Sequence, residues 1–462
     1  MSKHKRRDTT RLKRVTKVDE DSRRADISSI LRAMSLGSKN TIIPFSLERD
    51  IYGLFPGPGP FVGVGSTPNK LSRDLVEEVL VRVPFTSLRA VRLTCKNWND
   101  VCKDGSFIKK HIVEAKKKQV NEFEIIIMMN YKIYLMSVDL HSNVDPSITL
   151  KGTLFSLKDE ANHHQVDYII RVFHCDGVLL CITKDLKSSL VVWDPYSGQT
   201  RWIQPRDRYH DLDKYALGHD EKKKYKIFRF VDYSYAYRVE ERICELELYS
   251  FESDSWKVVL TVPPEWEIDY YHRGVSLKGN TYWHATNKVQ RKGRYDVFLI
   301  CFDFTTERFG PPLPLPFNTC CMDDIVTLSS AGEDQLAVLF QDGLTSAMEI
   351  WVTSKIEPTE VSWNKLFLAD YKGPVIGTDI LTTNDRSFFI DVKNNVAVVL
   401  DRGASSCARY IAYIIGNNEY FEKVDLGESA DPNCCPLVDL GDPNCCPLVC
   451  SYVPSTVQIR QL

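Results

Sequence analysis

Between Leu71 and His111, apolar residues recur at the spacing of helices. A first stripe at i, i+4, i+5 and i+8 predicts a helix with one apolar face, and it consists of Leu75, Val79, Leu80 and Val83. Ser72 can cap this helix, and Pro84 can end it. A second stripe at i, i+3, i+7 and i+10 follows Thr86, and it consists of Leu88, Val91, Cys95 and Trp98.

This helical stretch of about 40 residues is too small to bury a stable core without help. Its apolar positions therefore need cover, either from the rest of the chain or from another protein. The pattern alone leaves both possibilities open.

From Glu122 onward, the pattern changes to short β-rich runs separated by turns. A unit of an apolar strand, a polar turn and a second strand recurs, and it begins at Leu190, Leu246, Phe298, Met348 and Phe388. Landmark residues of these units lie roughly 40 to 60 residues apart, a period that suits a four-stranded propeller blade. They are Trp193, Phe251, Phe304, Trp351 and Ile390. We therefore expect a propeller rather than a sandwich.

The first 66 residues differ from both parts. They begin with a basic cluster between Lys3 and Arg14, which is either a nuclear-import or acid-binding patch or simply a solvated tail. They end with a Gly/Pro-rich linker, Phe55 to Thr67. The expected organisation is a disordered basic extension with its linker over 1–66, a helical module over 67–115 and a β domain over 122–462.

Composition favours a protein of the nucleus or cytoplasm, or of both, that is not secreted. The net charge of −2 gives no general drive toward nucleic acid. No apolar run approaches the length of a membrane span, and no apolar stretch follows the basic N-terminus as in a signal peptide. The 14 cysteines are then expected to be reduced thiols.

The helical segment resembles the F-box, which docks Skp-type adaptors of cullin-based ubiquitin ligases. The resemblance rests on Leu71, Asp74-Leu75, Glu78-Val79-Leu80, Arg82-Val83-Pro84, Ser87-Leu88, Val91-Arg92, Cys95-Lys96, Trp98 and Phe107. Ser72 stands where the family usually has proline. The resemblance implies an adaptor-facing set that is uncovered in the monomer: Leu71, Leu75, Val79, Leu80, Val83, Pro84, Leu88, Val91 and Leu93. Trp98 is expected inside the module.

The β region resembles the kelch-related F-box-associated interaction domain of the large plant F-box family. Segments that carry this resemblance include Cys175-Asp176-Gly177, Val192-Trp193-Asp194-Pro195, Gly279-Asn280-Thr281-Tyr282-Trp283 and Phe302-Asp303-Phe304. These positions define a scaffold, so target choice is expected in the loops. Candidate target-binding residues are Tyr233, Tyr235, Tyr237, Arg238, Trp266, Tyr270 and Tyr271, although aromatic packing inside the blades explains any one of them equally well.

Enzyme-like constellations are weak. His163-His164 with Asp167 fits a polar loop, and His174-Cys175-Asp176 fits the scaffold. The tail pairs Cys434-Cys435 and Cys445-Cys446, with Cys450, suggest zinc. However, DPNCCPLV occurs twice, from Asp431 and from Asp442, so a tandem duplication explains the pairs. We expect no catalytic residue, no metal and no cofactor.

The sequence thus predicts an α+β multidomain protein, a small helical F-box followed by a mainly-β propeller-like domain. The predicted function is that of a non-catalytic substrate-recognition subunit of a cullin-based ubiquitin ligase. Its partners would be a Skp-type adaptor, through it a cullin, and an unknown target protein, with no membrane or nucleic acid. The alternatives are an F-box scaffold outside the ligase and, less favoured, a kelch-like propeller enzyme.

Overall fold

The structure is a computed structural model. It describes residues 72–83, 88, 91–92, 96–118, 122–139, 147–154, 169–183, 189–204, 206, 213–232, 244–260, 264–268, 272–288, 296–319, 324–343, 345, 347–369, 386–402, 409–416, 421–428, 448–452, 457 and 459. Residue contacts divide the chain into two compact units, Met1–Val120 and Asn121–Leu462.

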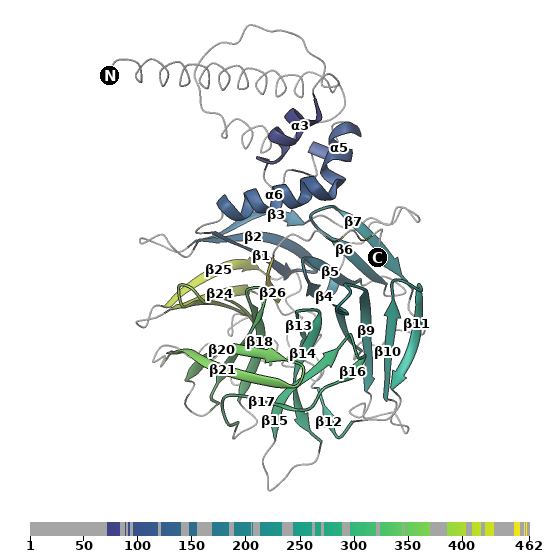
Figure 1. Ribbon diagram of the computed structural model, residues 1–462. Helices are drawn as coiled ribbons and strands as arrows, with labels where there is room; N and C mark the ends of the chain where they lie inside the picture. Colours follow the sequence, from purple (N-terminus) through teal and green to yellow (C-terminus); the bar gives the residue numbers. More distant parts are fainter. Residues whose placement is uncertain are drawn as a thin grey trace, which may run out of the picture. The chain divides into compact units, whose positions relative to one another are not determined.

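The first unit contains three described helices: α3 (Arg73–Leu80), α5 (Lys96–Lys103) and α6 (Gly105–Lys118) (Figure 1). Ser72 caps α3 as predicted, because its hydroxyl oxygen accepts a hydrogen bond from the Leu75 amide. Helix α3 ends at Leu80, four residues before Pro84. Among the described residues, no helix is long and apolar enough to cross a membrane.

The helices enclose a small core of their own. Its largest side chains are Trp98 and Phe107, which are 1% and 0% exposed. Helix α5 contacts both α3 and α6. The ring of His111 in α6 donates to the Val83 carbonyl across 2.8 Å and so ties α6 to the end of α3. The apolar residues of this module therefore form its own core, which stabilises it.

The second unit is a β-propeller of six antiparallel sheets, which we call blades 1 to 6 (Figure 1). Blade 2 contains β4 (Ile169–Cys175), β5 (Val178–Thr183), β6 (Leu190–Asp194) and β7 (Gln199–Ile203). Blade 3 contains β8 (Lys214–His219), β9 (Tyr225–Asp232), β10 (Cys244–Ser250) and β11 (Ser255–Leu260). The predicted hairpins from Leu190 and Leu246 are β6–β7 and β10–β11, so the third and fourth strands of these blades were foreseen.

Blades 4 to 6 continue the same order. Blade 4 contains β12 (Trp266–Glu267), β13 (Val275–Leu277), β14 (Asn280–Asn287), β15 (Val297–Asp303), β16 (Arg308–Phe309) and β17 (Leu313–Pro314). Blade 5 contains β18 (Ile325–Ala331), β19 (Gln335–Gln341), β20 (Met348–Glu357) and β21 (Glu360–Ala369). Blade 6 contains β22 (Ser387–Asp391), β23 (Val396–Arg402), β24 (Arg409–Gly416) and β25 (Phe421–Glu428).

The end of the chain completes blade 1. This blade contains β1 (Glu122–Met129), β2 (Lys132–Asp139), β3 (Ser147–Leu154) and β26 (Leu448–Ser451). Strand β26 pairs with β1 in antiparallel register, Ile127 opposite Val449. It also contacts β22 of blade 6, where the Val449 amide donates to the Ser387 hydroxyl across 2.9 Å. The ring is therefore closed by strands from both ends of the propeller.

Strands β4, β8, β13, β18, β22 and β26 line the inside of the ring, because they contact one another from blade to blade. Between the blades lie apolar clusters, such as the aromatic one where Phe228 of blade 3 meets Phe302 of blade 4 at 4.7 Å between ring centres. This architecture confirms the fold predicted from the sequence, short helices followed by a propeller.

Candidate functional site

The nine predicted adaptor-facing residues lie mostly inside the helical module or outside the described residues. Val79, Leu80, Val83, Leu88 and Val91 are buried, with exposed fractions of 8% or less. Leu75 is partly exposed. Leu71, Pro84 and Leu93 lie outside the described residues. The expectation that this set is uncovered in the monomer therefore does not hold for the five buried residues, because a module this small needs them for its own core.

Leu75 is thus the described member of the set that a partner can reach directly. Its neighbour Val76, which is not among the nine predicted residues, is 1% exposed and belongs to the core. The buried stripe of α3 therefore runs through Val76, Val79 and Leu80, and Leu75 stands at its edge. The apolar pattern alone could not show which side of α3 faces the core, because Leu75 and Val76 are adjacent and both fit an apolar stripe.

Of the seven predicted target-binding residues, the structure describes Trp266. Its ring lies edge-on against Phe309, with ring centres 4.7 Å apart, and also contacts Phe230. Trp266 is partly buried against the core between blades 3 and 4, which agrees with aromatic packing at this position. Tyr233, Tyr235, Tyr237, Arg238, Tyr270 and Tyr271 lie outside the described residues.

A cavity of about 80 Å³ lies among the innermost strands of the propeller. Its described lining includes His174, His272, His284, Arg273 and Arg386 and contains no carboxylate. His272 and His284 contact each other, with 2.9 Å between their Nδ1 atoms. Burial, with Lys214 nearby, lowers the pKa of His272 to about 4. The cavity has room for a few water molecules or a small hydrogen-bond acceptor.

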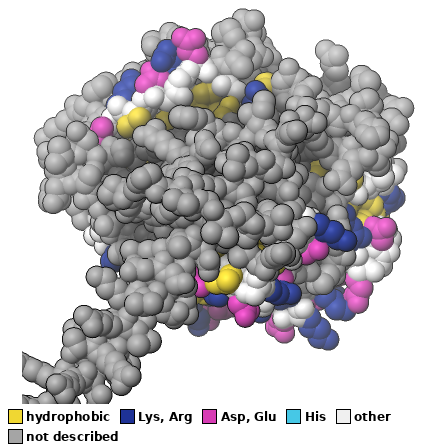
Figure 2. Space-filling model, turned by 90° about the horizontal axis from the view of Figure 1, so that it is seen from above, with side chains coloured by type: hydrophobic (Ala, Val, Ile, Leu, Met, Phe, Trp, Pro, Cys, Tyr) yellow, Lys and Arg dark blue, Asp and Glu magenta, His cyan; other side chains and the backbone are white. Residues whose placement is uncertain are grey.

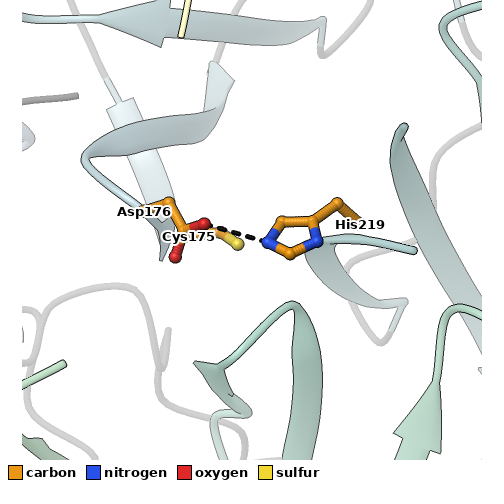
Figure 3. A group of neighbouring side chains, drawn as sticks. All are labelled: Cys175, Asp176 and His219. Atoms are coloured by element: carbon orange, nitrogen blue, oxygen red, sulfur yellow. Dashed lines mark hydrogen bonds and ion pairs between the residues drawn. The ribbon is translucent and has the colours of Figure 1, made fainter. Parts of the chain in front are cut away.

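A second polar group lies where blades 2 and 3 meet, at the ends of β4 and β8. Cys175 is the last residue of β4, Asp176 forms the following turn with Gly177, and His219 is the last residue of β8. Positive φ angles of 48° and 77° at Asp176 and Gly177 make this a tight hairpin turn. The turn holds Asp176 opposite His219, and Figure 3 shows the Cys175 sulfur beside the line that joins them.

The three side chains of this Cys–Asp–His group present ligand atoms within 4.8 Å of one another. Asp176 Oδ2 lies 2.9 Å from His219 Nε2, and the ammonium of Lys223 lies 2.9 Å from each of these atoms. Cys175 and His219 are buried, whereas Asp176 is 37% exposed. The group therefore combines a thiol, a carboxylate and an imidazole around one cation.

Ionisation in this group follows from the same contacts. The His219 imidazole, with the Lys223 ammonium, holds the pKa of Asp176 well below its usual range despite partial burial. Burial raises the pKa of the Cys175 thiol well above its usual value, and the nearby Asp176 carboxylate adds to this effect. Asp176 is thus an anion and Cys175 a protonated thiol in this arrangement.

Two known protein families match the sequence of this chain. A family described as the F-box associated beta propeller domain matches residues 124–459, and the F-box domain matches residues 69–110. The chain belongs to the F-box-associated propeller family. The resemblance stated from the sequence is confirmed in both parts.

Relatives from Arabidopsis thaliana are similar over most of the F-box protein's length. "F-box protein At5g42460" is 61% identical over 398 residues, which cover 85% of this chain and 98% of the relative. "F-box protein At2g17830" is 60% identical over 402 residues, with the same coverage of each chain. "F-box/kelch-repeat protein At3g16740" is 53% identical over 407 residues, covering 84% of this chain and 98% of that one.

The other sequence candidates in this F-box protein fall largely outside the described residues. These are His163, His164, Asp167 and the cysteine pairs at 434–435 and 445–446. The second DPNCCPLV copy contributes Leu448 and Val449 to β26, so the duplicated segment does reach the closing strand. His174-Cys175-Asp176 does lie in the scaffold as expected, but the sequence did not indicate that His219 and Lys223 join it. That proximity comes from blade packing, and no local pattern encodes it.

Charged side chains of both signs lie close together on the surface. Figure 2 shows Lys and Arg side chains next to Asp and Glu side chains over the described part of one face. Among the described residues of the propeller, Lys257 is paired with Glu307 at 2.5 Å and Arg409 with Asp425 at 2.6 Å. Such pairs leave few isolated charges in these places and contribute little to stability on their own.

Proposed function

We propose that this F-box protein is a substrate receptor of a cullin-based ubiquitin ligase. The helical module would dock a Skp-type adaptor, and the propeller would hold a target protein near the ubiquitin-conjugating enzyme. Catalysis by this chain would then consist of proximity, without an acid, base or nucleophile of its own.

The observation that carries the proposal is the presence of both modules in one chain, an F-box over 69–110 and an F-box associated propeller over 124–459. Each is a binding module rather than a catalytic one in the usual members of these families. The exposed edge of α3, at Leu75, supplies an apolar contact that the module's own core does not use fully.

The test replaces Leu75 by aspartate in the full chain. A carboxylate at an apolar contact must be stripped of water, so Leu75→Asp is expected to weaken adaptor binding by about 100-fold or more. Val113→Asp is the matched control, because Val113 is apolar and 52% exposed on α6 but lies beyond residues 69–110, which match the F-box domain. Binding to purified adaptor is measured by calorimetry, and far-UV circular dichroism checks that both variants are folded.

Adaptor binding that survives Leu75→Asp would refute the assigned contact. Cullin recruitment is tested separately, by asking whether the wild-type chain with its adaptor co-purifies with cullin. A chain that binds the adaptor but never enters the cullin complex would instead be a scaffold outside the ligase.

A further inference from the structure

The Cys–Asp–His group has the composition of a metal site. A thiolate, an imidazole nitrogen and a carboxylate oxygen are the three ligand types that bind zinc in proteins. The thiolate disfavours Mg²⁺ and Ca²⁺, which prefer oxygen ligands only. We propose that Cys175, Asp176 and His219 bind zinc, and that the ammonium of Lys223 takes the place of the metal in the structure described here.

The orientation of His219 supports this site. Its Nδ1 lies 2.8 Å from the carbonyl oxygen of Asp220, and because a carbonyl can only accept, Nδ1 carries the hydrogen. Its Nε2 lies 2.9 Å from both Asp176 Oδ2 and the Lys223 Nζ, and this is the atom that a metal would take as its ligand. A histidine that ligates a metal with one nitrogen usually donates from the other to a carbonyl or carboxylate in this way.

Packing around His219 fixes the ring further. Gly279 of blade 4 lies so close that a Cβ at this position would approach the imidazole to 2.4 Å. The ring also stands edge-on to Tyr225, with 5.1 Å between ring centres. The imidazole is therefore held in place before any metal binds, which lowers the cost of assembling a site.

Lys223 behaves as a stand-in for the cation. Its Nζ lies 2.9 Å from both Asp176 Oδ2 and His219 Nε2, so a carboxylate and an imidazole nitrogen are directed at one positive charge. Its side chain is 64% exposed and has a free path to solvent. On metal binding, the ammonium would swing away, the Cys175 thiol would lose its proton to solvent, and water would complete the four-coordinate shell through the exposed side of Asp176.

The site would join two blades. Cys175 and Asp176 belong to blade 2 and His219 to blade 3, and their innermost strands β4 and β8 contact each other. A metal there would clamp two blades at one end of the ring, as the Lys223 ion pair does in this structure.

The test uses Co²⁺ as an optical probe for zinc, because thiolate coordination gives cobalt an intense charge-transfer band. The full chain is used with Cys434, Cys435, Cys445 and Cys446 changed to serine, so that the tail cannot contribute a thiolate. One equivalent of Co²⁺ is expected to bind with the thiolate band and to be displaced by Zn²⁺. Cys175→Ser should abolish the band, whereas Cys181→Ser, at another fully buried cysteine in β5, should retain it.

Lys223 supplies the decisive comparison. If the ammonium competes with the metal, Lys223→Met should tighten Zn²⁺ binding by about tenfold or more, since a unit charge next to the ligands is removed. Lys222→Met is the control, because it removes the same charge from the exposed neighbouring position. Affinities are measured by competition with a chelator.

Loss of a ligand should weaken binding by about 100-fold, and His219→Gln and Asp176→Asn test this if Cys175→Ser does not fold. A chain that gives no thiolate band, a band that persists in Cys175→Ser, or a Lys223→Met variant no tighter than Lys222→Met would each overturn the proposal. In those cases the group is an ion pair between blades only.

Discussion

At the scale of single residues, the junction of blades 3 and 4 depends on a glycine, Gly279, because a side chain would not fit there. Gly279 has a φ of +84°, and its carbonyl accepts a hydrogen bond from the His219 amide at 3.0 Å. A methyl group there would meet the His219 ring and its carbonyl oxygen. Both the backbone conformation and the close approach therefore require glycine.

We predict that Gly279→Ala lowers the free energy of unfolding by about 2 kcal/mol more than Gly332→Ala does. Gly332 also has a positive φ, +73°, but nothing lies within 4 Å of a Cβ added there. Both variants bear the backbone cost, and only Gly279→Ala bears the clash. Urea unfolding of the full chain measures the difference, and equal losses would show that the clash is relieved without cost.

At the scale of elements, helix α6 depends on the residue just before it. Asp104 accepts hydrogen bonds from the amide and the hydroxyl of Ser106, at 2.8 and 2.5 Å, and so caps the helix. The Arg73 side chain of α3 also donates to this carboxylate. The contacts with Ser106 and Arg73 hold the pKa of Asp104 below its usual range.

Asp104→Ala is expected to destabilise the first turn of α6 by about 1 kcal/mol. Hydrogen exchange at the Ser106 amide measures this loss directly. The pKa of Asp104 is lower in the folded protein than in the unfolded chain, so on acidification the unfolded chain binds the proton first. The stabilisation by the Asp104 carboxylate is therefore complete above about pH 4 and is lost as the pH falls below it. Asp104→Asn should keep most of the cap without this pH dependence, and an unchanged acid response in Asp104→Asn would contradict the assignment.

The sequence predicts some of these elements well and others poorly. Apolar runs such as Leu190–Asp194 and polar turns between them are local signals, and they located the outer hairpins of blades 2 to 5. The unit from Phe388 is instead the inner hairpin β22–β23 of blade 6. Helix α3 was also predicted with its cap, but its rotation was not, so Val76 was missed and Leu80 was placed on the surface. The sequence indicated Cys175 and Asp176 but not His219, because His219 lies 43 residues further along the chain and reaches Asp176 only through packing between neighbouring blades.

At the scale of the whole molecule, the ring is held shut by one four-residue strand. Val449 in β26 is 4% exposed and packs with Ile125 and Ile127 of β1 and with residues of blade 6. The pairing of β26 with β1 could not be foreseen from local pattern, since the two strands lie near opposite ends of the propeller sequence.

Val449→Asp should therefore destabilise the propeller by about 3 kcal/mol or more, because it buries a carboxylate in the closing contact. Val258→Asp, on the outer strand β11 where Val258 is 38% exposed, should change the stability by less than about 0.5 kcal/mol. Urea unfolding followed by tryptophan fluorescence compares the two. Equal effects would mean that closure by β26 contributes little.

The position of β26 also sets an order of events during translation. Strand β1 ends at Met129, yet the strand that pairs with its free edge begins only at Leu448. At ordinary ribosome speeds, that edge stays open for roughly half a minute while the other five blades are made. A message cut short after codon 120 but before codon 448 would therefore yield a protein with a complete helical module and an unfinished ring.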